Sequence, residues 1–224
     1  MDSIQAIETQ YKGYRFRSRL EARWAVFFDA LGIKWEYEPE GFEIPFDDGN
    51  IRYLPDFKLV EHDIWVEVKG SEEQFKQDAE RIAWMVDFGH LPGVSVSDPK
   101  IGATGGLLIL GPVPDQIKGF RSVHPVLYHE KGVRIAMLSF VALPETPIIP
   151  FWDIFGDSPV SSAPDLPDLV GNFGWMGFTG YTTSGYVPAT YSCPIHHFPK
   201  ANDSAKHAYK AARSARFEHG ECGI

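Results

Sequence analysis

YLPDFKLVEHDIWVEVKG, residues 53–70, contains the most informative pattern in the chain. β-Branched and aromatic residues on either side of a short polar turn, EHD at 61–63, predict a β-hairpin. Pro55 and Asp56 are unusual inside its first strand, because strands are depleted in both residue types. Their presence indicates a role other than forming the sheet.

The second strand of this hairpin places an acid and a lysine on one face. Side chains alternate along a strand, so Glu67 and Lys69 share a face with Trp65, while the apolar residues between them pack on the core. If residues 61 and 62 form a two-residue turn, Asp56 lies opposite Glu67, with their Cβ atoms about 5 Å apart. Two carboxylates this close repel each other unless one is protonated or a cation binds between them. A three-residue turn would place Asp56 on the opposite face.

A pair of facing carboxylates predicts a divalent-metal site with Asp56 and Glu67 as ligands. Mg²⁺, or Mn²⁺ in its place, suits the position because it needs only one or two carboxylates besides water and substrate phosphate oxygens. Such an ion lowers the pKa of an attacking water and neutralises developing charge. The ammonium of Lys69 would position the hydroxide or stabilise the transition state. The pattern therefore predicts metal-assisted phosphodiester hydrolysis.

The elements around the hairpin predict an α/β fold. Apolar residues at helical spacing predict a helix over 18–32, which Ser18 caps and Gly32 ends. The further predicted elements are one or two strands over 33–46, an amphipathic helix over 71–89, a buried strand at 105–110, a second hairpin over 124–143 and a basic helix over 203–217. The order α-β-β-β-α-β predicts a mixed sheet with helices packed on it.

We expect the chain to divide near residue 142. Residues 1–142 contain the periodic elements of the α/β core. Residues 143–200 are rich in Pro, Gly and aromatic residues with little periodicity, which predicts a long loop or a small irregular subdomain. Residues 143–224 would then form an irregular extension that ends in a basic helix packed on the core.

The formal net charge of −9 is unevenly distributed. Segments 11–24 and 200–217 each carry five basic residues against one acidic residue. They are either a phosphate-binding rim around an acidic centre or two solvated helical faces. The candidate DNA-binding residues are Arg15, Arg17, Arg19, Lys76, Arg213 and Arg216, and for Lys76 a solvated helix face is the competing interpretation.

Pro55-Asp56, ten intervening residues and then Glu67-Val68-Lys69 resemble the signature of the PD-(D/E)XK nucleases, the restriction-endonuclease-like superfamily. RSRLEARWAVFFDALGIKWEYEPEGF (17–42), WVEVKG (65–70) and AARSARFEHGE (211–221) resemble a phage- and prophage-encoded group within it. The resemblance implies an αβββαβ core, a Mg²⁺-dependent deoxyribonuclease and products with 5′-phosphate ends. It also implies a catalytic glutamate from the first core helix, in the position of Glu21.

Structural interpretations remain open for each residue of this set. Glu21 follows Ser18 at the spacing of a capping box, so it either caps the helix or contributes a second-metal or water contact. Glu67 and Lys69 could form a solvent-facing ion pair, which stabilises a strand little. Asp56 could be a strand-end residue that follows a proline.

A structural zinc site is a further candidate. Cys193 and His196 form a Cys-x-x-His pair, and His219 and Cys222 form a His-x-x-Cys pair. Together they could supply the four ligands of a tetrahedral Zn²⁺.

Composition indicates a protein of the cytoplasm, or of the host cytoplasm if the chain is phage-encoded. The first sixteen residues lack the apolar core of a secretion signal, no apolar stretch is long enough for a membrane span, and the two cysteines make no disulfide framework. We expect DNA as partner and no membrane; the sequence leaves the oligomeric state open, with a homodimer as one option. The alternative function is a catalytically silent protein of nuclease fold that binds a host protein, which the acidic net charge favours.

Overall fold

The structure is a computed structural model, and it describes residues 7–46, 49–87, 95–98, 102–114, 124–129, 133–143, 146–153 and 203–217. The helices are α1 (Arg19–Leu31), α2 (Glu72–Asp87) and α4 (Asp203–Ser214), with a 3₁₀ turn at Val60–His62. The strands of the central sheet are β3 (Trp35–Tyr37), β6 (Phe57–Leu59), β7 (Ile64–Val68), β10 (Leu107–Leu110), β11 (His124–His129), β12 (Val133–Leu143) and β13 (Thr146–Asp153). Separate two-stranded ribbons are formed by β1 (Thr9–Tyr11) with β2 (Tyr14–Phe16), β4 (Phe42–Phe46) with β5 (Gly49–Tyr53), and β8 (Ser95–Asp98) with β9 (Gly102–Thr104).

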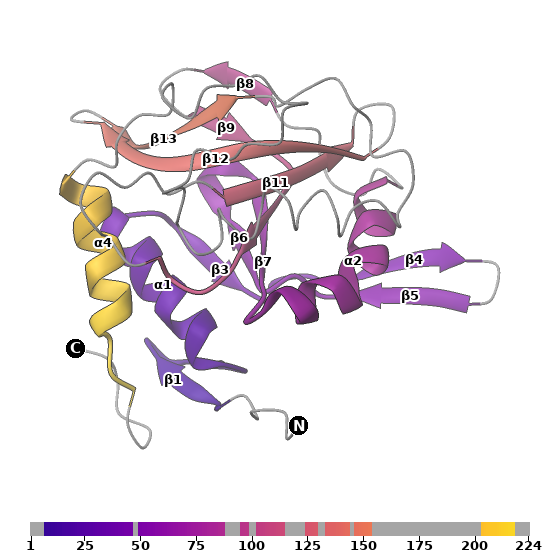
Figure 1. Cartoon of the computed structure of the whole chain (residues 1–224), viewed down its shortest axis with the longest axis horizontal. Coiled ribbons are helices and arrows are strands. Elements are labelled where there is room, and N and C mark those ends of the chain that lie inside the picture. The colour runs from indigo at the N-terminus through magenta and orange to yellow at the C-terminus, as the bar shows by residue number, and fades with distance from the viewer. Residues whose placement is uncertain are drawn as a thin grey trace.

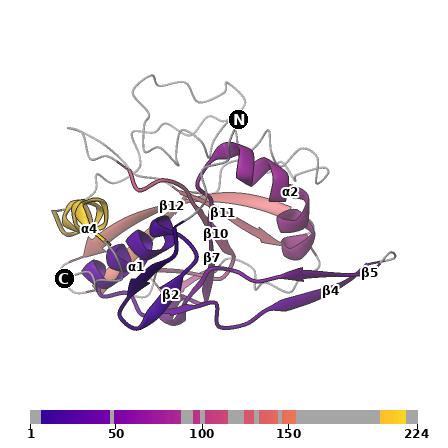
Figure 2. The same cartoon turned by 90° about the horizontal axis from the view of Figure 1, so that it is seen from below.

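The central sheet is mixed. In the described part of the chain its strand order is β13-β12-β11-β10-β7-β6-β3. These strands are labelled in Figure 1, except β10, which is labelled in Figure 2. β7 and β10 are parallel, and the other neighbouring strands are antiparallel. A parallel pair requires a crossover connection, which here contains α2. The predicted mixed α/β class is confirmed, as is the buried strand at 105–110, because all four residues of β10 are buried.

Helices cover both faces of this sheet. α1 and α4 lie on one side and α2 on the other, with the sheet between them in Figure 2. The cluster on the α1 side contains Phe57, Val66 and Leu108, whereas the cluster on the α2 side contains Trp65, Leu107 and Ile109. Neighbouring residues of one strand thus belong to opposite cores, as alternation along a strand requires.

Helix α1 has the ends that its sequence predicts. The Ser18 side chain accepts a hydrogen bond from the Glu21 amide, and Gly32 ends the helix with φ 73°, a left-handed conformation that glycine adopts without strain. The indole of Trp24 is fully buried, and its Nε1 donates to the carbonyl oxygen of Gly111 at 2.8 Å. This bond joins α1 to the segment that follows β10.

The predicted basic helix is confirmed as α4, and it packs against α1 (Figure 1). The ring of Tyr209 lies 4.5 Å from that of Phe27, centroid to centroid, and Tyr209 is fully buried. Its hydroxyl is 2.9 Å from Nε2 of the buried His124 on β11. Residues near the two ends of the chain therefore share one core.

Two predictions of local structure are wrong. Residues 53–60 do not form one strand: β5 ends at Tyr53, β6 begins at Phe57, and Pro55 lies in the break because it has no N–H to donate to a ladder. The segment predicted to be irregular beyond residue 142 includes β13, which pairs with β12 at the edge of the sheet. Within the described residues, no helix is both long and apolar enough to cross a membrane.

Candidate active site

Asp56 lies immediately before β6, where the chain turns from the β4–β5 ribbon into the central sheet. Its Oδ2 accepts a hydrogen bond from the backbone amide of Val68 at 2.7 Å, and its own carbonyl accepts one from the Glu38 amide at 2.9 Å. β6 pairs with β7 only as far as Phe57 and Val66. The carboxylate therefore satisfies a β7 amide just beyond the end of that ladder.

The hairpin has the predicted register but a different turn. Phe57 pairs with Val66, which places Asp56 across from Glu67, as the two-residue turn would have done. The prediction of that turn is wrong, because a 3₁₀ turn at Val60–His62 and Asp63 connect the strands. Asp63 completes the reversal with φ 50°, a left-handed conformation that Asp tolerates better than most residues.

Both oxygens of the Glu67 carboxylate contact other side chains. The hydroxyl of Tyr53 donates to Oε2 at 2.6 Å, and Nζ of Lys69 lies 2.7 Å from Oε1. Glu67 and Lys69 are both buried, 5% and 8% exposed. The solvent-facing ion pair that the sequence also allowed is therefore wrong.

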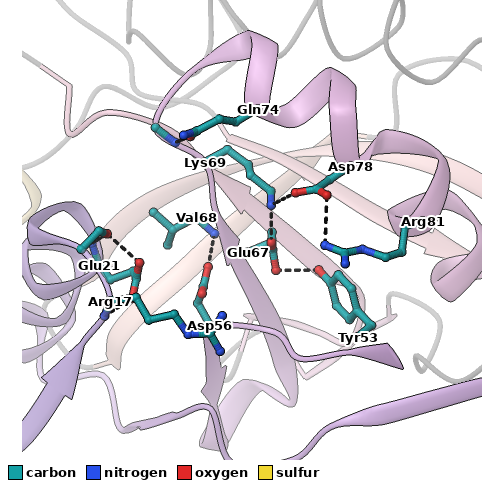
Figure 3. Close-up of polar contacts among 12 residues, drawn as sticks. Arg17, Glu21, Tyr53, Asp56, Glu67, Val68, Lys69, Gln74, Asp78 and Arg81 are labelled. Carbon is teal, nitrogen blue, oxygen red and sulfur yellow. Dashed lines mark hydrogen bonds and ion pairs between the residues drawn. The ribbon is translucent and has the colours of Figure 1, made fainter. Parts of the chain in front are cut away.

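Helix α2 supplies the second partner of Lys69. The ammonium also bonds Oδ2 of Asp78, whose Oδ1 accepts from Arg81 at 3.0 Å, as Figure 3 shows. The guanidinium carbon of Arg81 lies 5.7 Å from the ring centroid of Tyr53. Tyr53, Glu67, Lys69, Asp78 and Arg81 thus form a closed ring of contacts, called the acid-lysine ring below.

Glu21 takes part in the start of α1. Its Oε1 accepts from the Ser18 hydroxyl at 2.6 Å, and its Oε2 accepts from the Tyr37 hydroxyl at 2.7 Å and from the Arg17 amide at 3.1 Å. The capping interpretation therefore has support, with the side chain bonded to the hydroxyl of Ser18 and the neighbouring amide. The carboxylate is buried and lies near enough to Asp56 to affect its pKa.

The electrostatics show a shortage of positive charge around Asp56. Burial raises the pKa of Asp56 well above its usual range, and the charges of Glu67 and Glu21 raise it further, against the Val68 amide and Lys69, which lower it. Burial lowers the pKa of Lys69, but the carboxylates of Glu67 and Asp78 outweigh this, so the pKa is raised overall. Burial and the charge of Glu67 also raise the pKa of Tyr53, which keeps its hydroxyl a donor.

These residues fit a divalent cation. Asp56 and Glu67 are hard oxygen donors from the ends of adjacent strands, and a cation between them would relieve the repulsion that raises the pKa of Asp56. The described residues contain no group of three or more His, Cys, Asp and Glu side chains arranged to hold a metal. Two carboxylates suffice for Mg²⁺ or Mn²⁺ when water and a phosphate supply the remaining ligands.

The candidate DNA-binding residues are distributed over several elements. Arg15 bonds Glu8, and Arg17 bonds Glu38, although both arginines are exposed. Arg19 is exposed at the start of α1, and Lys76 is exposed on α2. Arg213 near the end of α4 is half-buried, and Arg216 beyond it is exposed. The six residues are therefore spread over the β1–β2 ribbon, the start of α1, helix α2 and the end of α4.

Sequence reasoning missed three contributors to the site. Asp78 follows Lys69 by nine residues and flanks the buried stripe of α2, where an acidic residue is usually solvated. Tyr53 and Tyr37 fit equally well as core aromatics of their strands. The zinc candidates Cys193, His196, His219 and Cys222 lie outside the described residues.

The chain was compared with protein-family models, with curated proteins and with solved structures, and none of the three comparisons found a match.

Proposed function

We propose that this protein is a Mg²⁺- or Mn²⁺-dependent nuclease that hydrolyses phosphodiester bonds in DNA. One observation carries the proposal: Asp56 and Glu67 are both buried, they lie across from each other in the β6–β7 register, and the charge of Glu67 raises the pKa of Asp56. Lys69 pairs with Glu67 and Asp78. A buried, ionised Asp56 beside Glu67 and Glu21 still destabilises the fold. A divalent ion at this position supplies compensating charge.

The order of the elements supports a restriction-endonuclease-like core. α1, β3, β6, β7, α2 and β10 follow one another in the chain, interrupted by the β4–β5 and β8–β9 ribbons. This order agrees with the αβββαβ arrangement of the PD-(D/E)XK superfamily, which the residues Pro55-Asp56 and Glu67-Val68-Lys69 resemble. A fold of this kind does not by itself imply activity, which depends on the residues of the site.

Each residue has a role that follows from its contacts. Asp56 and Glu67 would hold the metal ion, which when bound lowers the pKa of a water ligand and offsets charge on the phosphate. Lys69 stays protonated beside Glu67 and Asp78, so it would stabilise negative charge on the phosphate and cannot act as a general base. Tyr53 orients the Glu67 carboxylate through its hydroxyl.

The proposal predicts metal-dependent cleavage that requires Lys69. The purified protein should cleave at least one of plasmid, linear and branched DNA in Mg²⁺ or Mn²⁺ but not in EDTA. Lys69→Met, which keeps the length and loses the charge, should reduce the cleavage rate about 100-fold or more. Gel-based cleavage rates at fixed metal concentration measure this.

Lys58→Met is the matched control, because Lys58 lies on the neighbouring strand β6 and contacts Asp63 and Trp65, neither of which belongs to the acid-lysine ring. It should retain the wild-type rate. Cleavage that survives in Lys69→Met would show that another site or a contaminant is responsible. No cleavage of any substrate would favour the protein-binding alternative.

A further inference from the structure

In the acid-lysine ring, two carboxylates contact one ammonium group. Nζ of Lys69 is 2.7 Å from Oε1 of Glu67 and also bonds Oδ2 of Asp78. Glu67 lies on β7, and Asp78 lies on α2, which packs over the same face of the sheet. The ammonium is therefore held from a strand on one side and from a helix on the other (Figure 3).

Asp78 is itself held in place. Its second carboxylate oxygen accepts from Arg81, three residues further along α2. The Asp78 side chain is 30% exposed and that of Lys69 is 10% exposed, so the bond between them is partly shielded from water. Partial shielding strengthens the interaction of the ammonium with Asp78 relative to a fully solvated pair.

A cation that binds Glu67 competes with Lys69 for the same carboxylate. A divalent ion and an ammonium on one carboxylate repel each other strongly at contact distances. Without a second acid, the Lys69 ammonium would either stay buried without an ion-pair partner or remain on Glu67 and weaken metal binding. Asp78 removes this conflict because it neutralises the ammonium without Glu67.

We propose that Asp78 is a positioning residue that takes over the Lys69 ammonium when a divalent cation binds Glu67. The inference rests on the proposed function, since it assumes the metal site at Asp56 and Glu67. Asp78 touches neither the metal nor the substrate, and its effect passes through Lys69. The chain would thus keep Lys69 beside the reacting phosphate while leaving Glu67 available as a ligand.

The test measures Mn²⁺ binding without DNA, from the electron paramagnetic resonance signal of the free ion. Asp78→Asn should raise the dissociation constant of Mn²⁺ about tenfold, the low end of the effect of losing a residue that supports a metal ligand. Asp78→Glu, which keeps the carboxylate, should stay within about threefold of wild type. Circular dichroism verifies that each variant folds, and Asp78→Ala replaces Asp78→Asn if the latter does not.

A double-mutant cycle separates positioning from simple loss of charge. In a Lys69→Met background there is no ammonium to hold, so Asp78→Asn should change the dissociation constant less than about threefold. Glu73→Gln is the charge control, because Glu73 is an exposed acid on the same helix. It should leave Mn²⁺ binding at the wild-type level.

The outcomes distinguish this inference from the proposed function. Equal weakening by Asp78→Asn with and without Lys69 would overturn the inference, since Asp78 would then act only through its own charge. Unchanged binding in Asp78→Asn would overturn it as well, and DNA cleavage could stand in both cases. Absence of Mn²⁺ binding, or binding that Glu67→Gln leaves unchanged, would overturn the metal site and the inference together.

Discussion

At the scale of single residues, Asp56 explains why a proline and an aspartate interrupt a strand. Pro55 follows the end of the ribbon, and the Asp56 carboxylate bonds the Val68 amide, which lies beyond the last pair of the β6–β7 ladder. The same carboxylate lies near Glu67 and Glu21, whose charges raise its pKa. Asp56 therefore supports the strand end while introducing a charge that the fold tolerates poorly without a cation.

Asp56→Asn should stabilise the metal-free protein at neutral pH. Folding raises the pKa of Asp56, so the folded state retains a proton that the unfolded state has lost above about pH 4. The free energy of unfolding of the wild type therefore falls as pH rises from about 4 to the folded pKa, by about 1.4 kcal/mol per pH unit. Urea unfolding in EDTA at pH 7 and pH 4 measures this.

The advantage of Asp56→Asn should shrink toward pH 4, where the unfolded carboxylate also binds a proton. Asparagine can still accept the Val68 hydrogen bond through its side-chain oxygen. Mg²⁺ should raise the stability of the wild type and not that of the variant. A variant less stable than wild type at pH 7 would mean that the carboxylate is well compensated by its own partners.

The sequence predicted the facing of Asp56 and Glu67 but not the full site. Alternation along the strand places Glu67 and Lys69 on one face. The position of Asp56 depended on the register, for which the sequence left a two-residue and a three-residue turn open. Asp78 and Tyr53 could not be placed, because the way in which α2 and the β4–β5 ribbon lie against the sheet depends on tertiary packing. Periodicity identifies the buried side of a helix, and it does not identify which flanking residue meets a given strand.

At the scale of elements, α1, β11 and α4 meet around a buried histidine. His124 on β11 is fully buried, with its ring 5.5 Å from that of Trp24 and its Nε2 2.9 Å from the Tyr209 hydroxyl. Burial lowers the pKa of His124 to about 3, so the ring is neutral in the folded protein at ordinary pH. The joint between these three elements therefore depends on a group that gains a proton on unfolding.

His124→Gln should reduce the loss of stability between pH 7 and pH 5. The unfolded histidine has a pKa near 6.5 and binds a proton as pH falls below it, whereas the folded histidine does not until about pH 3. The contribution of His124 to the free energy of unfolding therefore falls as pH falls, by about 2 kcal/mol at pH 5. Urea unfolding at both pH values, compared between wild type and variant, measures the difference. Equal pH dependence in the two proteins would contradict the assignment of a buried neutral ring.

The helices could be predicted from their periodic apolar patterns, and the buried strand from its continuous apolar run. Ser18 and Gly32 bound α1, and the continuous apolar run of β10 has no other reasonable position than the middle of a sheet. The break between β5 and β6 was missed because the alternating residues on both sides of Pro55 match a single strand equally well. The ribbon β4–β5 leaves the central sheet at that proline.

At the scale of the whole molecule, the fold depends on α4 covering α1. Ala205, Ala208, Tyr209 and Ala212 are buried on α4, and the small alanines allow the two helices to approach closely. The sequence predicted this helix but not where it packs, because a local apolar pattern does not indicate which element covers the apolar face. The irregular composition beyond residue 142 likewise concealed β13, in which prolines interrupt the alternation.

Tyr209→Ala should destabilise the protein by about 3–5 kcal/mol, the usual effect of truncating a fully buried aromatic ring. Tyr209→Phe, which removes only the hydroxyl bonded to His124, should cost about 1 kcal/mol. Urea unfolding curves of the two variants give the comparison. If the two substitutions have the same effect, the packing of α4 on α1 contributes little to stability.

The pairing of α1 with α4 also has a consequence for biosynthesis. About 170 residues separate the end of α1 from the start of α4, and at 5–20 residues per second a ribosome needs roughly 10–35 s to make them. Throughout that interval the aromatic face of α1, including Phe27, has no covering helix. The nascent chain therefore exposes an apolar surface that chaperones can bind until α4 emerges. Only then can α4 pack on α1, the helix that carries Glu21.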